Sequence, residues 1–188
     1  MAIRIFIDQG HNPSNPNAGA EANGIREQDV NYEVGIALAE LLNSDPNFVA
    51  EVSRATPDTS LGSTTAESLA ARVNAARAFG ADWFISIHSN ASTITSASGT
   101  EGYVFSADSP AFEFAESIVE GISEYTGLAD RGVFVRPSLF VLRRTSMPAT
   151  LIELGFLTNP SDAALLRDDP ELFARGMYAG ILDYFDLT

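Results

Sequence analysis

The chain of 188 residues contains no cysteine, and none of its 11 basic residues is lysine, so each of them is arginine. Without cysteine there is no thiol nucleophile, no cysteine-ligated zinc and no disulfide framework. Without lysine there is no Schiff-base lysine and no P-loop lysine. These absences exclude pyridoxal enzymes and ordinary P-loop nucleotide hydrolases.

Positive charge is also scarce, because 25 acidic residues against 11 basic ones give a formal net charge of -14. Nucleic-acid binding draws on clustered positive charge, so we expect no nucleic-acid partner. No stretch is long enough to span a membrane, and the opening MAIRIFID lacks the apolar segment of a secretory signal. We therefore expect no membrane partner and no signal peptide in this chain.

Strand-like and helix-like segments alternate along the chain. The predicted strands are residues 2–8, 48–53, 83–87, 100–106, 139–142 and 149–154, and the predicted helices are residues 26–43, 63–79, 110–126 and 170–185. Parallel strands need helical crossovers, so this order predicts an α/β three-layer sandwich with helices on both faces of a mostly parallel sheet of about six strands. Length and a 45% hydrophobic composition predict one domain over residues 1–188, which we expect to be a monomer.

The only two histidines both follow predicted strands. His11 comes after residues 2–8, and His88 comes after residues 83–87. The loops that leave the carboxyl ends of parallel strands share one edge of the sheet, so these two side chains can meet there. A lone histidine at such a place is usually a surface residue, so only the two histidines together indicate a site.

Two glutamates extend this pattern. Glu27, in GIREQD, begins the helix after the His11 loop, where an acidic residue also suits the helix dipole. Two histidines and one glutamate form a known ligand set for catalytic zinc, which leaves a fourth position to water. Glu153 stands in the apolar run ATLIEL, where a charge rarely serves packing and can act as a base beside zinc. Alternatively, Glu153 reaches solvent or pairs with Arg143 or Arg144.

Four segments together resemble a known family. They are FIDQGHNP, EQD, SIHSNA and VLRRTSMPATLIELGFLTN, and in order and spacing they are similar to the motifs of the zinc-dependent N-acetylmuramoyl-L-alanine amidases of the amidase-3 type. The resemblance implies hydrolysis of the amide bond between N-acetylmuramic acid and L-alanine in peptidoglycan, at the bacterial cell wall. It also implies that His11, Glu27 and His88 hold zinc and that Glu153 is the catalytic base and acid.

The first motif departs from the family at one point. Residues 8–12 are Asp-Gln-Gly-His-Asn, whereas such families usually have Asp-Pro-Gly-His-Gly. The histidine itself stays in place. We also expect substrate contacts from Asn90 and from Arg143 or Arg144, one of which should face the crevice because neighbours on a strand alternate.

Other functions share these residues. The same ligand set would serve another zinc amide hydrolase, including a carboxypeptidase-like enzyme, and a wall-binding module could keep the fold without catalysis. Retention of all four site residues argues against such a module. A serine hydrolase that uses Ser86 or Ser89 is disfavoured because the chain has no G-x-S-x-G motif.

Overall fold

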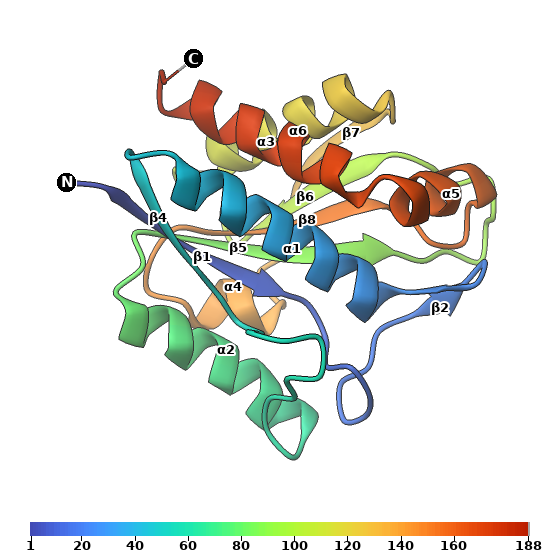
Figure 1. The fold of residues 1–188 in the computed structure, drawn as a ribbon, viewed down its shortest axis with the longest axis horizontal. Coiled ribbons are helices and arrows are strands. Elements are labelled where there is room, and N and C mark those ends of the chain that lie inside the picture. Colours follow the sequence, from blue (N-terminus) through green and yellow to red (C-terminus); the bar gives the residue numbers. More distant parts are fainter. Residues whose placement is uncertain (188) are drawn as a thin grey trace.

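A twisted sheet lies between two layers of helices in the computed structural model, which describes residues 1–187 (Figure 1). The strands are β1 (Ile3–Gln9), β2 (Glu21–Ala22), β3 (Ile25–Arg26), β4 (Phe48–Val52), β5 (Trp83–Asn90), β6 (Thr100–Val104), β7 (Asp130–Val135) and β8 (Ala149–Phe156). The helices are α1 (Glu27–Ser44), α2 (Thr65–Phe79), α3 (Ala111–Thr126), α4 (Phe140–Arg144), α5 (Pro160–Asp168) and α6 (Pro170–Tyr184). None of these helices is long and apolar enough to cross a membrane.

The main sheet has six strands in the order β4-β1-β5-β8-β6-β7. Every neighbouring pair is parallel except β6 and β8, which are antiparallel. Strands β2 and β3 form a separate antiparallel pair in the loop before α1. The predicted α/β fold with a mostly parallel sheet is therefore confirmed.

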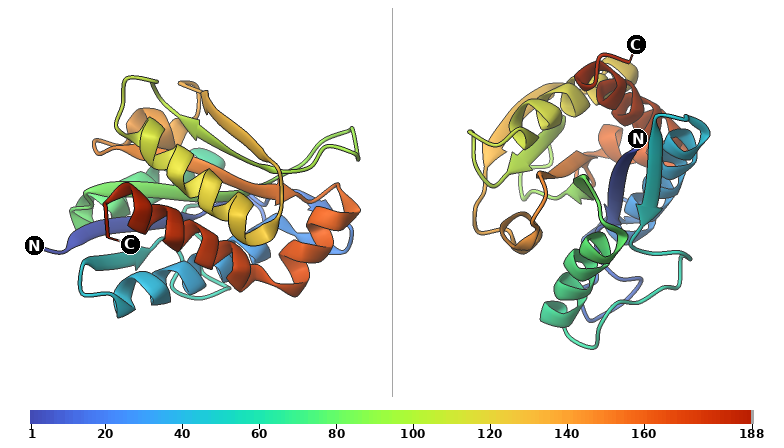
Figure 2. Two further views of the ribbon diagram at one scale, coloured as in Figure 1. Left: turned by 90° about the horizontal axis from the view of Figure 1, so that it is seen from above. Right: turned by 90° about the vertical axis from the view of Figure 1, so that its left-hand side faces the viewer.

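Helices α1, α3 and α6 cover one face of the sheet, and α2 and α4 lie on the other (Figures 1 and 2). The hydrophobic core is divided in the same way. Ile5 and Ile7 of β1 pack in the cluster that includes residues of α1, α3 and α6, whereas Phe6 packs in the cluster that includes residues of α2 and α4. A strand buried on both faces is apolar at odd and even positions, which explains the apolar run in residues 5–7.

Helix α2 has well-defined ends. The Thr64 side chain caps its N-terminus by accepting a hydrogen bond from the Glu67 backbone N–H at 3.1 Å, and the Glu67 carboxylate accepts one from the Ser63 N–H at 2.8 Å. The pair is a variant of the capping box, because Glu67 binds the N–H of Ser63, one residue before the N-cap, rather than that of Thr64 itself. The helix ends at Gly80, whose φ of 70° is readily adopted only without a side chain.

One predicted strand is wrong. Residues 139–142 were expected to be extended, but Phe140–Arg144 form the short helix α4. Periodicity does not separate a short apolar strand from one turn of buried helix, and here Val141 and Leu142 are buried from a helix. Strand β7 and helix α5 were not predicted, although Asn159 and Pro160 at the start of α5 are typical of a helix N-terminus.

Candidate metal centre

Three side chains from separate parts of the chain converge at the carboxyl ends of β1 and β5. His11 follows β1, Glu27 begins α1 and His88 lies in β5. The Oε1 atom of Glu27 is 3.1 Å from Nε2 of His11 and 3.0 Å from Nδ1 of His88. One possible ligand atom from each residue lies within 4.8 Å of the other two. We call these three residues the His-Glu-His group.

Glu27 is fixed by the backbone around it. Its Oε2 accepts a hydrogen bond from the Ala20 N–H at 2.9 Å, and its Oε1 accepts one from the Ser89 N–H at 3.2 Å. Burial raises the pKa of this carboxyl, but hydrogen bonds from His11 and His88 and their positive charge outweigh burial and hold it well below its usual range. Glu27 is therefore an ionised, buried carboxylate, as a metal ligand must be.

His11 has an unusual backbone conformation. Its φ of 70° lies in the left-handed region, which non-glycine residues rarely adopt and which often marks a functional site. The Nδ1 atom of its ring lies 3.3 Å from the Asn17 carbonyl oxygen. In the metal-free protein Nε2–H donates to Glu27. With Nδ1–H donating to the Asn17 carbonyl and Nε2 deprotonated, Nε2 would offer its lone pair to a metal ion.

Two glycines allow the backbone to approach the His-Glu-His group. A Cβ on Gly10 would lie 2.5 Å from the His88 ring, and one on Gly19 would lie 2.8 Å from Oε2 of Glu27. Any side chain at these positions would displace the group. The close packing therefore depends on glycine at both places.

The His-Glu-His group suits a zinc ion. It offers two imidazole nitrogens and one carboxylate oxygen, which is a donor set of catalytic zinc sites. Among the described residues no other histidine, aspartate or glutamate joins the group. Three protein donors without a fourth fit an open site rather than a closed structural one.

Glu153 lies beside this group. On β8 it pairs in register with His88 of β5 on one side and with Glu101 of β6 on the other. The strand continues to Phe156, so Glu153 lies inside β8 rather than at its end, where the sequence suggested it. Burial raises the pKa of Glu153 well above its usual value, and the charges of Glu27 and Glu101 raise it further.

The two carboxylates at this position differ in their partners. Glu101 accepts hydrogen bonds from Asn90 Nδ2 at 2.8 Å, from Arg131 Nε at 2.7 Å and from the Tyr103 hydroxyl. In contrast, Oε2 of Glu153 is buried with no hydrogen-bond partner among residues 1–187. Glu153 therefore has an oxygen free to accept a proton, whereas both oxygens of Glu101 are engaged.

Glu101 is not among the site residues predicted from the sequence, although a carboxylate within the strand-like segment TEGYV could have indicated it. It did single out Asn90, whose side-chain amide donates to Glu101. A contact of Asn90 with substrate stays a prediction.

Arg143 and Arg144 lie on α4 and are exposed. The Arg144 guanidinium is 5.9 Å from the centre of the Phe140 ring. The expectation that one arginine faces the crevice relied on strand alternation, which does not apply to a helix. Their contact with substrate remains a prediction without that support.

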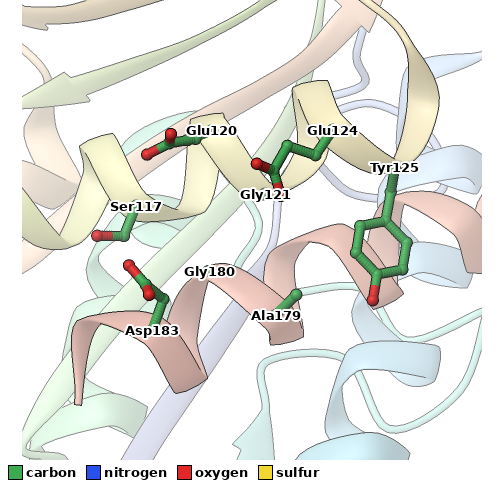
Figure 3. A pocket seen from close by; sticks show the side chains of 8 residues that line it. All are labelled: Ser117, Glu120, Gly121, Glu124, Tyr125, Ala179, Gly180 and Asp183. Carbon is green, nitrogen blue, oxygen red and sulfur yellow. The ribbon is translucent and has the colours of Figure 1, made fainter. Parts of the chain in front are cut away.

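A pocket of about 140 Å³ adjoins the His-Glu-His group. Its lining residues are Asp8, Gly10, His11, Asn17, Leu69, Arg72, His88, Leu139, Phe140, Val141 and Leu151. A second hollow of about 290 Å³ lies between α3 and α6 and is lined by acidic side chains and Tyr125 (Figure 3). No histidine lines that hollow, so the chemistry belongs to the pocket beside the His-Glu-His group.

Comparison with known proteins decides the family. The family model described as N-acetylmuramoyl-L-alanine amidase matches residues 5–183. The chain belongs to the N-acetylmuramoyl-L-alanine amidase family. It is 34% identical to the amidase CwlM of Bacillus licheniformis, over 99% of this chain and 70% of the relative.

Two further relatives agree with this assignment. The chain is 33% identical to the endolysin of Bacillus phage SPP1, over 100% of this chain and 68% of the relative. The crystal structure of an N-acetylmuramoyl-L-alanine amidase from Clostridium difficile 630 superposes with a TM-score of 0.87 at 32% identity, covering 98% of this chain and 97% of that one. The amidase family, its fold and its class of hydrolase, predicted from the sequence, are thus confirmed.

Proposed function

We propose that this amidase cleaves peptidoglycan at the bacterial cell wall with a zinc ion held by His11, Glu27 and His88. The observation that carries the proposal is the convergence of these three donors beside Glu153, a buried carboxylate with an unpaired oxygen. We further propose that residues 1–188 form one catalytic domain that acts as a monomer.

The ligand atoms would be Nε2 of His11, Nδ1 of His88 and a carboxylate oxygen of Glu27. When bound, zinc would act as a Lewis acid, which polarises the amide carbonyl and lowers the pKa of a water molecule toward neutrality. The negative charge of Glu27 and its backbone hydrogen bonds keep all three donors in place before the metal arrives.

Glu153 is the proposed proton carrier. Its Oε2 takes a proton from the attacking water molecule as the oxygen atom of that water forms a bond to the lactyl carbonyl carbon. The same oxygen then gives that proton to the L-alanine nitrogen as the carbon–nitrogen bond breaks. The products are the lactyl carboxylate of the muramic acid and a stem peptide with a free amino terminus. Burial raises the pKa of Glu153, which makes this oxygen a stronger base than an exposed glutamate.

The apolar pocket beside the His-Glu-His group gives the substrate a place next to the reacting atoms. Two of its polar members, Asp8 and Arg72, bind each other at 2.6 Å. Apart from Asn17 and the two histidines, the remaining lining is glycine, aliphatic or aromatic. Binding there would exclude water around the scissile bond and strengthen the electrostatic effect of the site.

Turnover of purified cell walls tests the proposed function. We expect the parent protein to release soluble fragments with new amino-terminal alanine and no new reducing sugar ends. Removal of metal with a chelator should abolish release, and zinc added in excess of the chelator should restore it. Walls bound without any new amino termini would indicate a binding module. Undiminished release by metal-free protein would contradict a zinc mechanism.

A further inference from the structure

A buried arginine on α2 binds the loop that carries His11. The side chain of Arg72 is 1% exposed. Its Nη1 donates to the Asp8 carboxylate and to the Gln9 carbonyl, each at 2.6 Å. Its Nη2 donates to the His11 carbonyl at 2.6 Å and to Oδ1 of Asn12 at 3.2 Å. One guanidinium therefore contacts four of the five residues between 8 and 12.

These contacts act on a strained piece of backbone. His11 has a φ of 70°, and such a conformation is strained for a residue with a side chain and persists only where the surroundings hold it. The Gly10 N–H donates to the Ile87 carbonyl at 2.9 Å, and the Asn12 N–H donates to the Asn17 carbonyl at 2.9 Å. These bonds fix the residues on either side, whereas Arg72 binds the carbonyl of His11 itself.

The anchor of Arg72 is itself rigid. Asp8 is fully buried, and its second oxygen accepts a hydrogen bond from Ser86 Oγ of β5 at 2.8 Å. A planar guanidinium can bind Asp8 with one nitrogen and the His11 carbonyl with the other in a fixed geometry. The ammonium of lysine is a single point donor on a flexible stem and does not reproduce this double attachment.

We propose that Arg72 is a positioning residue of the metal centre, which holds the His11 backbone in the conformation that turns Nε2 toward Glu27. The proposal rests on the proposed function in one respect, namely that the His-Glu-His group binds zinc. In this role Arg72 is not a metal ligand, and it acts on the metal centre through the backbone of His11.

The substitution Arg72→Lys tests this role because it keeps the positive charge beside Asp8 and removes the double attachment. We expect zinc affinity, measured by competition with a chromophoric chelator, to fall about 10–100-fold, as is typical when a partner of a metal ligand is lost. We also expect the ring signals of His11 in NMR spectra of the metal-free protein to shift. The chain has only two histidines, so these signals are readily assigned.

Arg54→Lys is a matched control. Arg54 is 0% exposed, and its guanidinium donates to the carbonyls of Gln28 at 2.8 Å and Pro57 at 2.6 Å, but to no atom of residues 8–12. Both variants should lower the thermal stability of the metal-free protein. Only the Arg72 variant should alter the His11 signals and the zinc affinity beyond experimental error.

Two results would overturn the proposal. One is a folded Arg72→Lys protein with parental zinc affinity and unshifted His11 signals. The other is an equal loss of affinity in Arg54→Lys, which would indicate general loosening. A parent protein that binds no zinc would refute the proposed function instead. The His11 signals of the metal-free variants would then still decide whether Arg72 positions this histidine.

Discussion

Glu153→Gln should lower kcat on purified walls by about 10²–10⁴-fold, the usual cost of losing a positioned proton-transfer group. The carboxamide keeps the shape of the side chain but cannot accept a proton at the position of Oε2. Zinc content should stay at the parental level, because Glu153 is not among the proposed ligands. Steady-state hydrolysis and metal analysis of the same protein preparation measure both quantities.

Glu101→Gln is the matched control for this result. Glu101 is also a buried carboxylate and pairs with Glu153 across β6 and β8, but three donors occupy its oxygens. We expect this variant to lose stability, because it leaves donors such as Arg131 without a charged acceptor. Its loss of rate should be much smaller than that of Glu153→Gln. If the two variants ranked in the opposite order, Glu153 would not be the base.

His11→Ala and His88→Ala should each abolish stoichiometric zinc binding. A four-ligand zinc site binds with about 10–16 kcal/mol, so each ligand accounts for roughly 3 kcal/mol or about 100-fold in affinity. Removing one of only three protein ligands should therefore leave the site largely empty at micromolar zinc. Equilibrium dialysis followed by metal analysis measures the remaining occupancy.

The behaviour of Glu153→Gln controls for indirect loss of metal. That variant changes a side chain next to the group and should still bind one zinc per chain, whereas the histidine variants should not. A histidine variant that retained full zinc content and full hydrolysis would place the metal elsewhere. Circular dichroism of each variant checks that the fold survives.

Much of the fold follows from the sequence because its strands are strongly apolar and helix α2 is capped at both ends. The apolar run in residues 5–7 predicts a strand covered on both faces, and Thr64, Glu67 and Gly80 mark the ends of α2. The meeting of His11, which follows β1, with His88 of β5 could also be predicted, because parallel strands present their carboxyl ends at one edge of the sheet.

Features that depend on tertiary contacts could not be predicted from the sequence. The apolar residues 139–142 fit a strand as well as a helix, and only their packing against α2 and β8 selects the helix α4. Because residues 139–142 were assigned to a strand, strand alternation was wrongly applied to Arg143 and Arg144, which lie on helix α4. Strand β7 was not predicted because it lies at the edge of the sheet, where most of its residues are exposed and its sequence shows no pattern of buried positions.

The supporting contacts of the site were the least predictable. Glu101 reaches Glu153 because β6 runs antiparallel to β8, and no local pattern in the chain encodes that register. Arg72 is an ordinary arginine on an amphipathic helix in the sequence, yet it is buried against residues 8–12, which precede it by 60 to 64 positions. The sequence shows which side chains could bind metal or carry a proton, but it does not show which residues contact those side chains in the fold.

Anomalous diffraction at the zinc absorption edge, from crystals of the protein purified with zinc, tests the central claim most directly. The account predicts one peak about 2.0–2.2 Å from Nε2 of His11, Nδ1 of His88 and a carboxylate oxygen of Glu27, with no fourth protein ligand. A peak away from these atoms, or a fourth ligand from the protein, would contradict a catalytic zinc at the His-Glu-His group.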